Sequence, residues 1–287
     1  MSSAVVRTRP AASRRRKPGR TVATVARFVG IALVVAAFLI PLIWMLLASL
    51  KSNLEIIDPS RTLNFTPTLS NYDTVFGAQA FTPFIINSFI VGAGSTLIGL
   101  LLGVPAAYGI ARYRIKNATA FVLLARVIPG VSLLIPWYFL FAQMQLVGTY
   151  TVLILTHIFV TMPLVVAIMT SFFEGIPEDL EEAAQIDGSS RIGAFVRVVL
   201  PLSVPGIATA TILSFIFSWN NFLFALVLSN QDTRTLPVAI SNFTSYAAID
   251  WGGLMAASVV ITVPVMLIAL LAQKYVVSGL TAGATKG

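Results

Sequence analysis

The sequence predicts an all-α membrane protein with six transmembrane helices. Of its 287 residues, 57% are hydrophobic and only 10% are charged, and the mean hydropathy is +0.88. An ordinary soluble domain has roughly a quarter of its residues charged, so this composition excludes a soluble enzyme. Apolar runs of about 20 residues, the length that crosses roughly 30 Å of hydrocarbon, occur at six places. They are residues 28–50, 84–108, 120–144, 150–172, 207–228 and 254–272.

The segment before the first run, residues 1–27, is a basic arm with eight Lys and Arg residues. A basic arm can bind nucleic acid. This one directly precedes an apolar run, so we interpret it as a cytoplasmic anchor and expect no nucleic-acid partner. The apolar run is also longer than the roughly 7–15 residues of a secretory signal, so we interpret it as a retained helix.

The Lys and Arg residues outside the six runs are distributed unequally between the two sides of the membrane. With the N-terminus inside, fifteen of them fall in inside segments and three in outside segments. Cytoplasmic loops carry an excess of Lys and Arg, so we expect both termini to face the cytoplasm. The outside segment 51–83 and the inside segment 173–206 are long enough to suggest functional loops.

The residues that usually carry chemistry are scarce. The chain has no Cys and one His, and the six apolar runs contain no Asp or Glu. Disulfides, cysteine nucleophiles and a zinc site are therefore not expected, and an intramembrane enzyme would lack a catalytic pair. An ion-coupled secondary transporter remains the alternative function, although it usually needs carboxylates or a proton relay near the midplane.

The loop 173–206 contains six of the eleven acidic residues of the chain. Pro177 at a helix start, followed by acids in the first turn, predicts a short helix. Gly188 is expected to end it. A second amphipathic helix is predicted over 190–199, with Pro201 as its stop. Two short helices meeting at a glycine could form a rigid projection that a soluble partner binds; the alternative is a solvated hairpin without a partner.

A known signature occurs within this loop. Its positions here are Glu182-Ala183-Ala184, Gly188 after three residues, Val198 after nine, and Leu200-Pro201 after one. The pattern resembles the EAA signature, E-A-A-x3-G-x9-I-x-L-P, of the membrane subunits of binding-protein-dependent ABC importers. Val198 in place of Ile is the one departure, and it keeps an apolar side chain. The resemblance implies a type I ABC importer permease fold with cytoplasmic EAA coupling helices.

In that family the EAA loop lies in a cleft of an ATP-hydrolysing subunit, whose closure rotates the membrane helices from inward-facing to outward-facing. By resemblance, Glu182 would pair with a basic residue of the ATPase; the alternative is an unpaired surface acid. The residues expected to couple the chain to the ATPase are Glu182, Ala183, Ala184, Asp187, Gly188, Leu200 and Pro201. The chain has no G-x-x-x-x-G-K-[ST] sequence, so ATP and Mg²⁺ are expected on partner subunits and no cofactor on this non-catalytic chain.

The ends of the chain sharpen the resemblance. The tail 274–287 is similar to that of the smaller maltose-type carbohydrate permease, whose end inserts between the ATPase subunits. Residues 218–222 and 86–89 also resemble that carbohydrate group. The tail residues expected to contact the ATPase are Thr281, Gly283 and Lys286. The expected organisation is a basic arm (1–27), a permease domain (28–273) with the loop 173–206, and a cytoplasmic tail (274–287).

The resemblance also implies partners and a substrate class. We expect a second permease subunit, two ATP-binding subunits, an extracytoplasmic solute-binding protein on the outer loops, and the bilayer of a bacterial cytoplasmic membrane. The expected substrate is a carbohydrate, polyol or glycoside, neutral or anionic. Dependence on ATP rather than on an ion gradient would separate this function from the secondary transporter.

Polar residues inside the runs are candidates for the substrate path, because they are costly in lipid and usually face a cavity or another helix. Ser214, Ser218 and Asn221 are predicted to share one helix face. The full candidate set is Ser214, Ser218, Trp219, Asn220, Asn221, Asn87 and Arg126. Helix-to-helix hydrogen bonding is the alternative for the small residues, and a carbonyl or carboxylate partner for Arg126. His157 is expected to be a hydrogen-bonded packing residue. Kinks are expected at Pro129, Pro136, Pro163 and Pro264.

Overall fold

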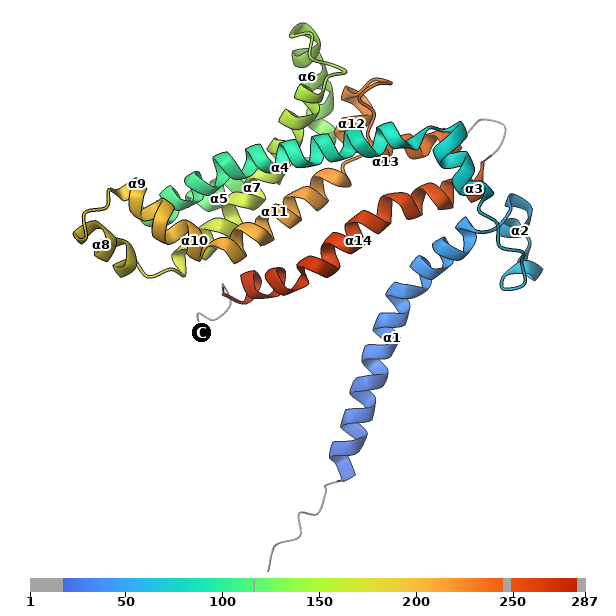
Figure 1. Cartoon of the computed structure of the whole chain (residues 1–287), viewed down its shortest axis with the longest axis horizontal. Coiled ribbons are helices and arrows are strands. Elements are labelled where there is room, and N and C mark those ends of the chain that lie inside the picture. The colour runs from blue at the N-terminus through green and yellow to red at the C-terminus, as the bar shows by residue number, and fades with distance from the viewer. Residues whose placement is uncertain (1–17, 116, 245–248, 283–287) are drawn as a thin grey trace, which may run out of the picture. The chain divides into compact units, whose positions relative to one another are not determined.

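The computed structural model describes residues 18–115, 117–244 and 249–282. These residues form helices joined by turns, and the β-structure among them is one isolated bridge between Thr244 and Ile249. The chain divides into two compact units, residues 1–47 and 48–287. Figure 1 labels the helices of both units.

The first unit contains most of α1 (Pro18–Ser49), which includes an apolar stretch, Thr24–Ser49, long enough to cross a membrane. The helix begins at Pro18 and not at residue 28, so the last ten residues of the predicted arm are helical. Proline is favoured at the first helical position because its missing N–H has no partner there in any case. Large apolar side chains such as Phe28, Leu33 and Phe38 are exposed.

The second unit is built around four long helices that lie side by side in Figure 1: α4 (Phe81–Arg112), α7 (Tyr150–Glu174), α11 (Val204–Trp219) and α14 (Trp251–Ala282). Helix α4 packs on α7 and α11, and α11 also packs on α14. We call the end of this bundle that carries residues 173–206 the loop end, and the opposite end the cap end.

Helices α4 and α7 approach each other closely because α4 has glycines at the contact. A Cβ atom at Gly103 would lie 2.8 Å from Cγ1 of Val165, and one at Gly94 would lie 2.9 Å from Cδ1 of Ile154. Small residues let helix backbones pack closely in membranes, where apolar burial adds little to association. The apolar core at the loop end includes Phe173, which is fully buried.

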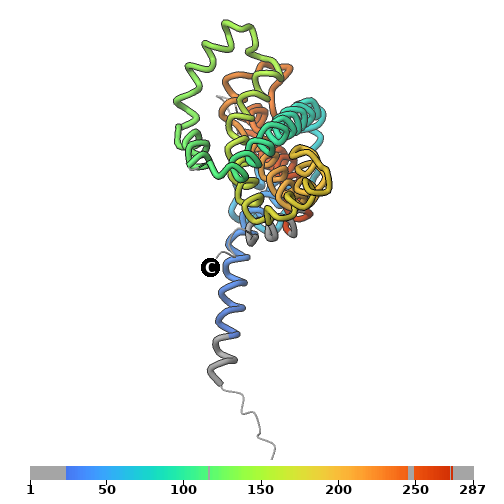
Figure 2. Tube along the Cα trace, turned by 90° about the vertical axis from the view of Figure 1, so that its left-hand side faces the viewer, coloured from blue at the N-terminus to red at the C-terminus, as the bar shows by residue number. Residues whose placement is uncertain are grey.

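The third apolar run, 120–144, is not one helix. It forms α5 (Ala118–Leu124) and α6 (Gly130–Gln143), separated by a turn that ends at Pro129. The residue before a proline is disfavoured in the α conformation, which explains the break. Helix α6 has 14 residues and so extends about 21 Å, less than the hydrocarbon thickness. In Figure 2 this green segment bulges away from the rest of the second unit.

The fifth run, 207–228, is also divided. Helix α11 ends at Trp219, and α12 (Leu223–Leu228) follows after a turn in which Asn221 Oδ1 accepts a hydrogen bond from the amide of Phe224 at 3.2 Å. The described residues thus contain four helices long and apolar enough to cross a membrane, or five if a bent pair described below is one span. The other predicted kink prolines, Pro136, Pro163 and Pro264, lie inside α6, α7 and α14.

The predicted outer segment 51–83 is ordered by short helices at the cap end. These are α2 (Asn53–Ile57), η1 (Pro59–Arg61), α3 (Ser70–Asp73) and η2 (Thr74–Ala78). The buried Lys51 Nζ donates to the carbonyls of Arg61 at 3.1 Å and Thr62 at 2.7 Å. Hydrogen bonds from the side chain and backbone of Ser52 lower the pKa of Glu55. The segment is therefore a folded group of short helices and not an extended loop.

Candidate functional site

The loop 173–206 contains α8 (Asp179–Ile186), α9 (Arg191–Ala194), η3 (Phe195–Val199) and α10 (Leu200–Leu202). Gly188, between α8 and α9, has φ of +93°, a left-handed conformation that glycine adopts without strain. The predicted stop at Pro201 is wrong, because the helical run continues to Leu202 and bends by 73° into α11. Pro201 lies in the first turn of α10, directly after the π-helical turn η3.

One carboxylate fastens this loop to the bundle. Glu181 is 6% exposed, and its Oε1 accepts a hydrogen bond from Nε of Arg112 at the end of α4. Its Oε2 accepts a hydrogen bond from the hydroxyl of Tyr108 at 2.5 Å. Nη1 of Arg112 donates to the carbonyl of Phe173 in α7 at 3.1 Å. A buried charge is costly unless it is paired and hydrogen-bonded, and here both oxygens of the carboxylate have a partner.

Aromatic rings surround this ion pair. The Tyr108 ring lies with its centroid 4.3 Å from that of Phe195 in η3 and 5.7 Å from that of Phe173. The charged side chains of Arg112 and Glu181 are 11% and 8% exposed, and a pair so far withdrawn from water attracts more strongly than one at the surface. We call Glu181, Tyr108 and Arg112 the loop anchor. It joins α4, α7, α8 and η3 at one point.

The signature residues lie mostly on the opposite, exposed side of the loop. Glu182, Ala183, Asp187 and Gly188 are exposed, and Ala184 is half-buried. Two isoleucines project beside them, with Ile186 86% exposed and Ile192 76% exposed. Large exposed apolar side chains grouped with charges are typical of surfaces that bind another protein. Leu200 is half-buried and Pro201 is exposed, near the bend into α11.

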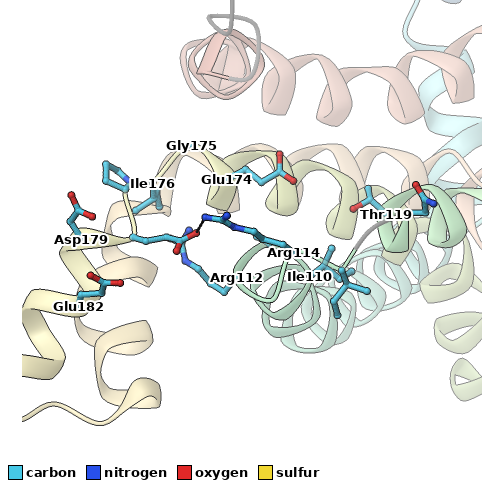
Figure 3. A pocket seen from close by; sticks show the side chains of 14 residues that line it. Ile110, Arg112, Arg114, Thr119, Glu174, Gly175, Ile176, Asp179 and Glu182 are labelled. Atoms are coloured by element: carbon cyan, nitrogen blue, oxygen red, sulfur yellow. Dashed lines mark hydrogen bonds and ion pairs between the residues drawn. The ribbon is translucent and has the colours of Figure 1, made fainter.

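A polar cavity of about 860 Å³ lies between α8 and the end of α4. Figure 3 shows Arg112 and Arg114 between the carboxylates of α8 on one side and Thr119 on the other. Arg114 Nη2 makes a 3.0 Å ion pair with Oε1 of Glu178, and both side chains are exposed to solvent. The wall also includes Glu174, Asp179 and Glu182, so carboxylates outnumber arginines there.

The residues predicted for a substrate path separate into different contacts. Ser218 is buried, and its Oγ lies 2.6 Å from Nδ1 of His157 and 2.9 Å from Oγ of Ser95. This contact gives His157 the hydrogen bond expected of a packing residue. Ser214 is also buried. Asn221 does not continue this face, because α11 ends before it.

The side chains of the other polar candidates donate hydrogen bonds to backbone carbonyls. Trp219 Nε1 donates to the carbonyl of Ile261 at 3.2 Å, and Asn220 Nδ2 donates to that of Ile216 at 2.9 Å. Asn87 Nδ2 donates to the carbonyls of Asp232 at 2.8 Å and Arg234 at 2.9 Å. These contacts connect helices and turns. A role of the same residues in the substrate path stays a prediction.

Arg126 is not inside a helix. It lies in the turn between α5 and α6, it is exposed, and its guanidinium carbon is 5.3 Å from the ring centroid of Phe217 in α11. An aromatic ring is thus its neighbour in place of the predicted carbonyl or carboxylate. Of the tail residues, Thr281 belongs to the last turn of α14, while Gly283 and Lys286 lie outside the described residues.

The loop anchor was not predicted from the sequence. The coupling role was assigned to Glu182, and Glu181 beside it was given none. The available signal was Tyr108 and Arg112, which are four residues apart at the end of a predicted span and therefore share a helix face. An arginine at such a position needs a partner, and the acidic helix of the next long loop supplies one.

Comparison with known families decides the identity. Residues 95–282 match the family described as the binding-protein-dependent transport system inner membrane component. This chain belongs to that permease family. The match includes the whole 173–206 loop and confirms the resemblance inferred from the EAA signature.

Two relatives extend the likeness to most of the permease. The sulfoquinovosyl glycerol transport system permease protein SmoH of Agrobacterium fabrum is 40% identical over 91% of this chain and 93% of its own. The trehalose transport system permease protein SugB of Mycobacterium tuberculosis is 38% identical over 89% and 95%. The permease also shares its fold with a chain of a bacterial ABC transporter that imports the acidic polysaccharide alginate, with a TM-score of 0.73, 20% identity, and coverage of 93% and 99%.

Proposed function

We propose that this permease forms half of the translocation path of an ATP-driven, binding-protein-dependent importer of a carbohydrate or carbohydrate derivative. ATP and Mg²⁺ are bound by two separate ATPase subunits, the other half of the path is a second permease, and a solute-binding protein docks outside. Counting the divided third and fifth runs as one crossing each gives six crossings, so both termini lie on the same side of the membrane. The excess of Lys and Arg in the inside segments supports the cytoplasm as that side. The chain itself carries out no chemical step.

The observation that carries this proposal is the arrangement of the two faces of α8. The buried face holds the loop on the bundle through Glu181, and the exposed face presents Glu182 and Ile186 to solvent. A projection that is rigidly anchored and apolar at its tip is suited to fit the cleft of an ATPase. Closure of that cleft then moves the anchored helices, which alternates the access of the path.

The test is to isolate the tagged permease from its native membrane in mild detergent. We expect an ATP-binding subunit, a second permease and a solute-binding protein in the eluate, together with ATPase activity. Ligand screening on that binding protein then identifies the substrate. Recovery of this chain alone, without ATPase activity and with uptake driven by an ion gradient in liposomes, would overturn the proposal in favour of a secondary transporter.

The substrate class follows from the relatives, which are named for sulfoquinovosyl glycerol and trehalose. We therefore propose a short saccharide or a glycoside as the substrate.

Arg126 favours an anionic member of that class. An exposed guanidinium in a membrane protein is costly unless it faces water, an anion or a partner. Its described neighbour is the neutral ring of Phe217, and the six apolar runs contain no Asp or Glu to neutralise it. Replacing Arg126 with Leu is expected to weaken uptake of an anionic sugar while uptake of its neutral analogue persists, and Arg126→Lys to retain both. Equal uptake of the anionic sugar by wild type and Arg126→Leu would remove this assignment.

A further inference from the structure

Helix α4 is attached by side chains to segments at both ends of the bundle. At the loop end, Tyr108 and Arg112 hold Glu181, as described above. At the cap end, Asn87 and Ser88 hold residues 232–236, which run from the turn after α12 into the first residue of α13. Arg112 follows Ser88 by 24 residues, which correspond to about 36 Å of helix.

The cap-end contacts are as specific as the loop anchor. Asn87 is 3% exposed and Ser88 is 2% exposed. The amide of Asn87 donates to two backbone carbonyls, at 2.8 and 2.9 Å, and its Oδ1 accepts a hydrogen bond from the hydroxyl of Tyr150 at 2.7 Å. Oγ of Ser88 accepts a hydrogen bond from the amide of Leu236 at 2.7 Å. We call Asn87 and Ser88 the cap anchor.

The covalent connection between the loop and the following helix, α11, is less direct. On the C-terminal side, the chain passes through the π-helical turn η3 and then bends by 73° between α10 and α11. A bend and a π-helical turn are points at which a helix can change direction. Movement of the loop can therefore be absorbed there, whereas the loop anchor joins it to α4, a helix of 32 residues that continues through Pro105.

We propose that α4 is the element that transmits movement of the loop 173–206 to the segment 232–236, and that the loop anchor is the positioning group that attaches the loop to it. This inference rests on the proposed function, because an ATPase must move the loop. It goes beyond it by naming the helix and the residues through which the movement passes. It also assigns the loop anchor to coupling and leaves partner binding to the exposed side of α8.

We expect the same link to work in both directions, because a coupling free energy between two binding sites is reciprocal. An event at the cap end, such as docking of a loaded binding protein, is transmitted by α4 to the loop and to the ATPase. If α4 carries this signal, weakening either anchor reduces the stimulation of ATP hydrolysis from outside. A purely structural role predicts a different result, in which the loop misfolds and the ATPase no longer binds.

The experiment uses the complete transporter in liposomes. ATP hydrolysis is measured with and without substrate-loaded binding protein, and substrate uptake is measured in parallel. The first variants are Glu181→Gln and Tyr108→Phe. The matched control is Glu178→Gln, which removes a carboxylate of the same helix region whose ion pair is exposed. A second site is tested by Ser88→Ala, which removes the acceptor for Leu236 at the far end of α4.

We expect Glu181→Gln to keep the ATPase bound and to lower the stimulation by loaded binding protein about tenfold, within the usual range of coupling energies. Tyr108→Phe and Ser88→Ala are expected to lower it about threefold, and uptake per ATP should fall with them. The double variant Tyr108→Phe with Ser88→Ala should lower the stimulation by a smaller factor than the product of the two single reductions, because both changes interrupt one link. Glu178→Gln should behave like wild type.

Two results would overturn the inference while leaving the proposed function intact. One is full stimulation of ATP hydrolysis in Tyr108→Phe and in Ser88→Ala, under conditions in which the wild-type complex couples normally. The other is loss of the ATPase from Glu181→Gln together with normal coupling in Tyr108→Phe, which would make the anchor structural only. Failure of the wild-type chain to bind any ATPase would instead reject the proposed function itself.

Discussion

Two adjacent glutamates in α8 have opposite environments. Glu181 is 6% exposed and bound to Tyr108 and Arg112, whereas Glu182 is exposed at the cavity wall. The side chains are chemically identical, so the difference arises from the helix face on which each lies. The comparison teaches that one short helix divides two tasks between its faces. The buried face attaches the loop to the bundle, and the exposed face is available to a partner.

The largest effect is expected on the buried face. Arg112→Met leaves the Glu181 carboxylate buried without its cation, a change that usually costs about 3–5 kcal/mol. Unfolding of the purified permease in denaturing detergent is expected to shift accordingly. Arg114→Met, which breaks only an exposed ion pair, is the matched control. Equal stability of the two variants would show that the pair does not hold the loop.

The exposed face is expected to affect binding and not stability. Ile186 is 86% exposed, so Ile186→Asp has little apolar packing to lose. If Ile186 inserts into the ATPase, the aspartate should weaken ATPase binding by about 2 kcal/mol or more, as for a residue at the centre of an interface. Less ATPase should then be recovered with the permease. Leu54→Asp, at a 77% exposed position in α2, should leave recovery unchanged. Normal recovery with Ile186→Asp would place the interface elsewhere.

The junction between α8 and α9 is expected to give an intermediate effect. Gly188 has φ of +93°, and a Cβ atom added there would meet no neighbouring atom, so strain and not collision opposes a substitution. Gly188→Val should destabilise the loop by about 1–2 kcal/mol, and Gly188→Asn by less, since Asn tolerates left-handed conformations. Hydrogen exchange of residues 179–194 measures this. Identical exchange in both variants would contradict it.

The smallest effect is expected at the exposed ion pair between Glu178 and Arg114. Glu178→Gln removes an ion pair whose two side chains are 80% and 45% exposed. Exposed pairs contribute at most about 1 kcal/mol and are screened by salt. Its thermal unfolding should therefore match wild type at high salt and differ slightly at low salt. A loss as large as that of Arg112→Met would erase the distinction between the buried and exposed pairs.

Hydropathy predicts the long uninterrupted helices well and the divided ones poorly. The runs 84–108, 150–172 and 254–272 lie inside α4, α7 and α14. The run 120–144 is divided before Gly130 although Pro129 was recognised as an interruption, because a proline either kinks or ends a helix and composition does not distinguish the two. The run 207–228 is divided by a turn capped by Asn221, which a hydropathy average does not detect.

The site was predictable in its position and signature but not in its attachment. The two short helices on either side of Gly188 are present in the structure, since these depend on the local sequence, whereas the coupling role of the signature residues stays a prediction. The contact of Glu181 with Arg112 joins residues far apart in the chain. Which of several neighbouring carboxylates such an arginine takes depends on the angle at which α8 meets α4. That angle is a property of packing, so the anchor became visible only in the structure.

Site-specific cross-linking from the exposed face of α8 tests the central claim most directly. The chain has no cysteine, so Ile186→Cys introduces a unique thiol that can carry a photo-cross-linker in the intact complex. The account predicts an adduct between this position and the ATPase subunit, and none from Leu54→Cys at the cap end. An intact, active complex in which Ile186→Cys gives no ATPase adduct, or Leu54→Cys gives one, would contradict it.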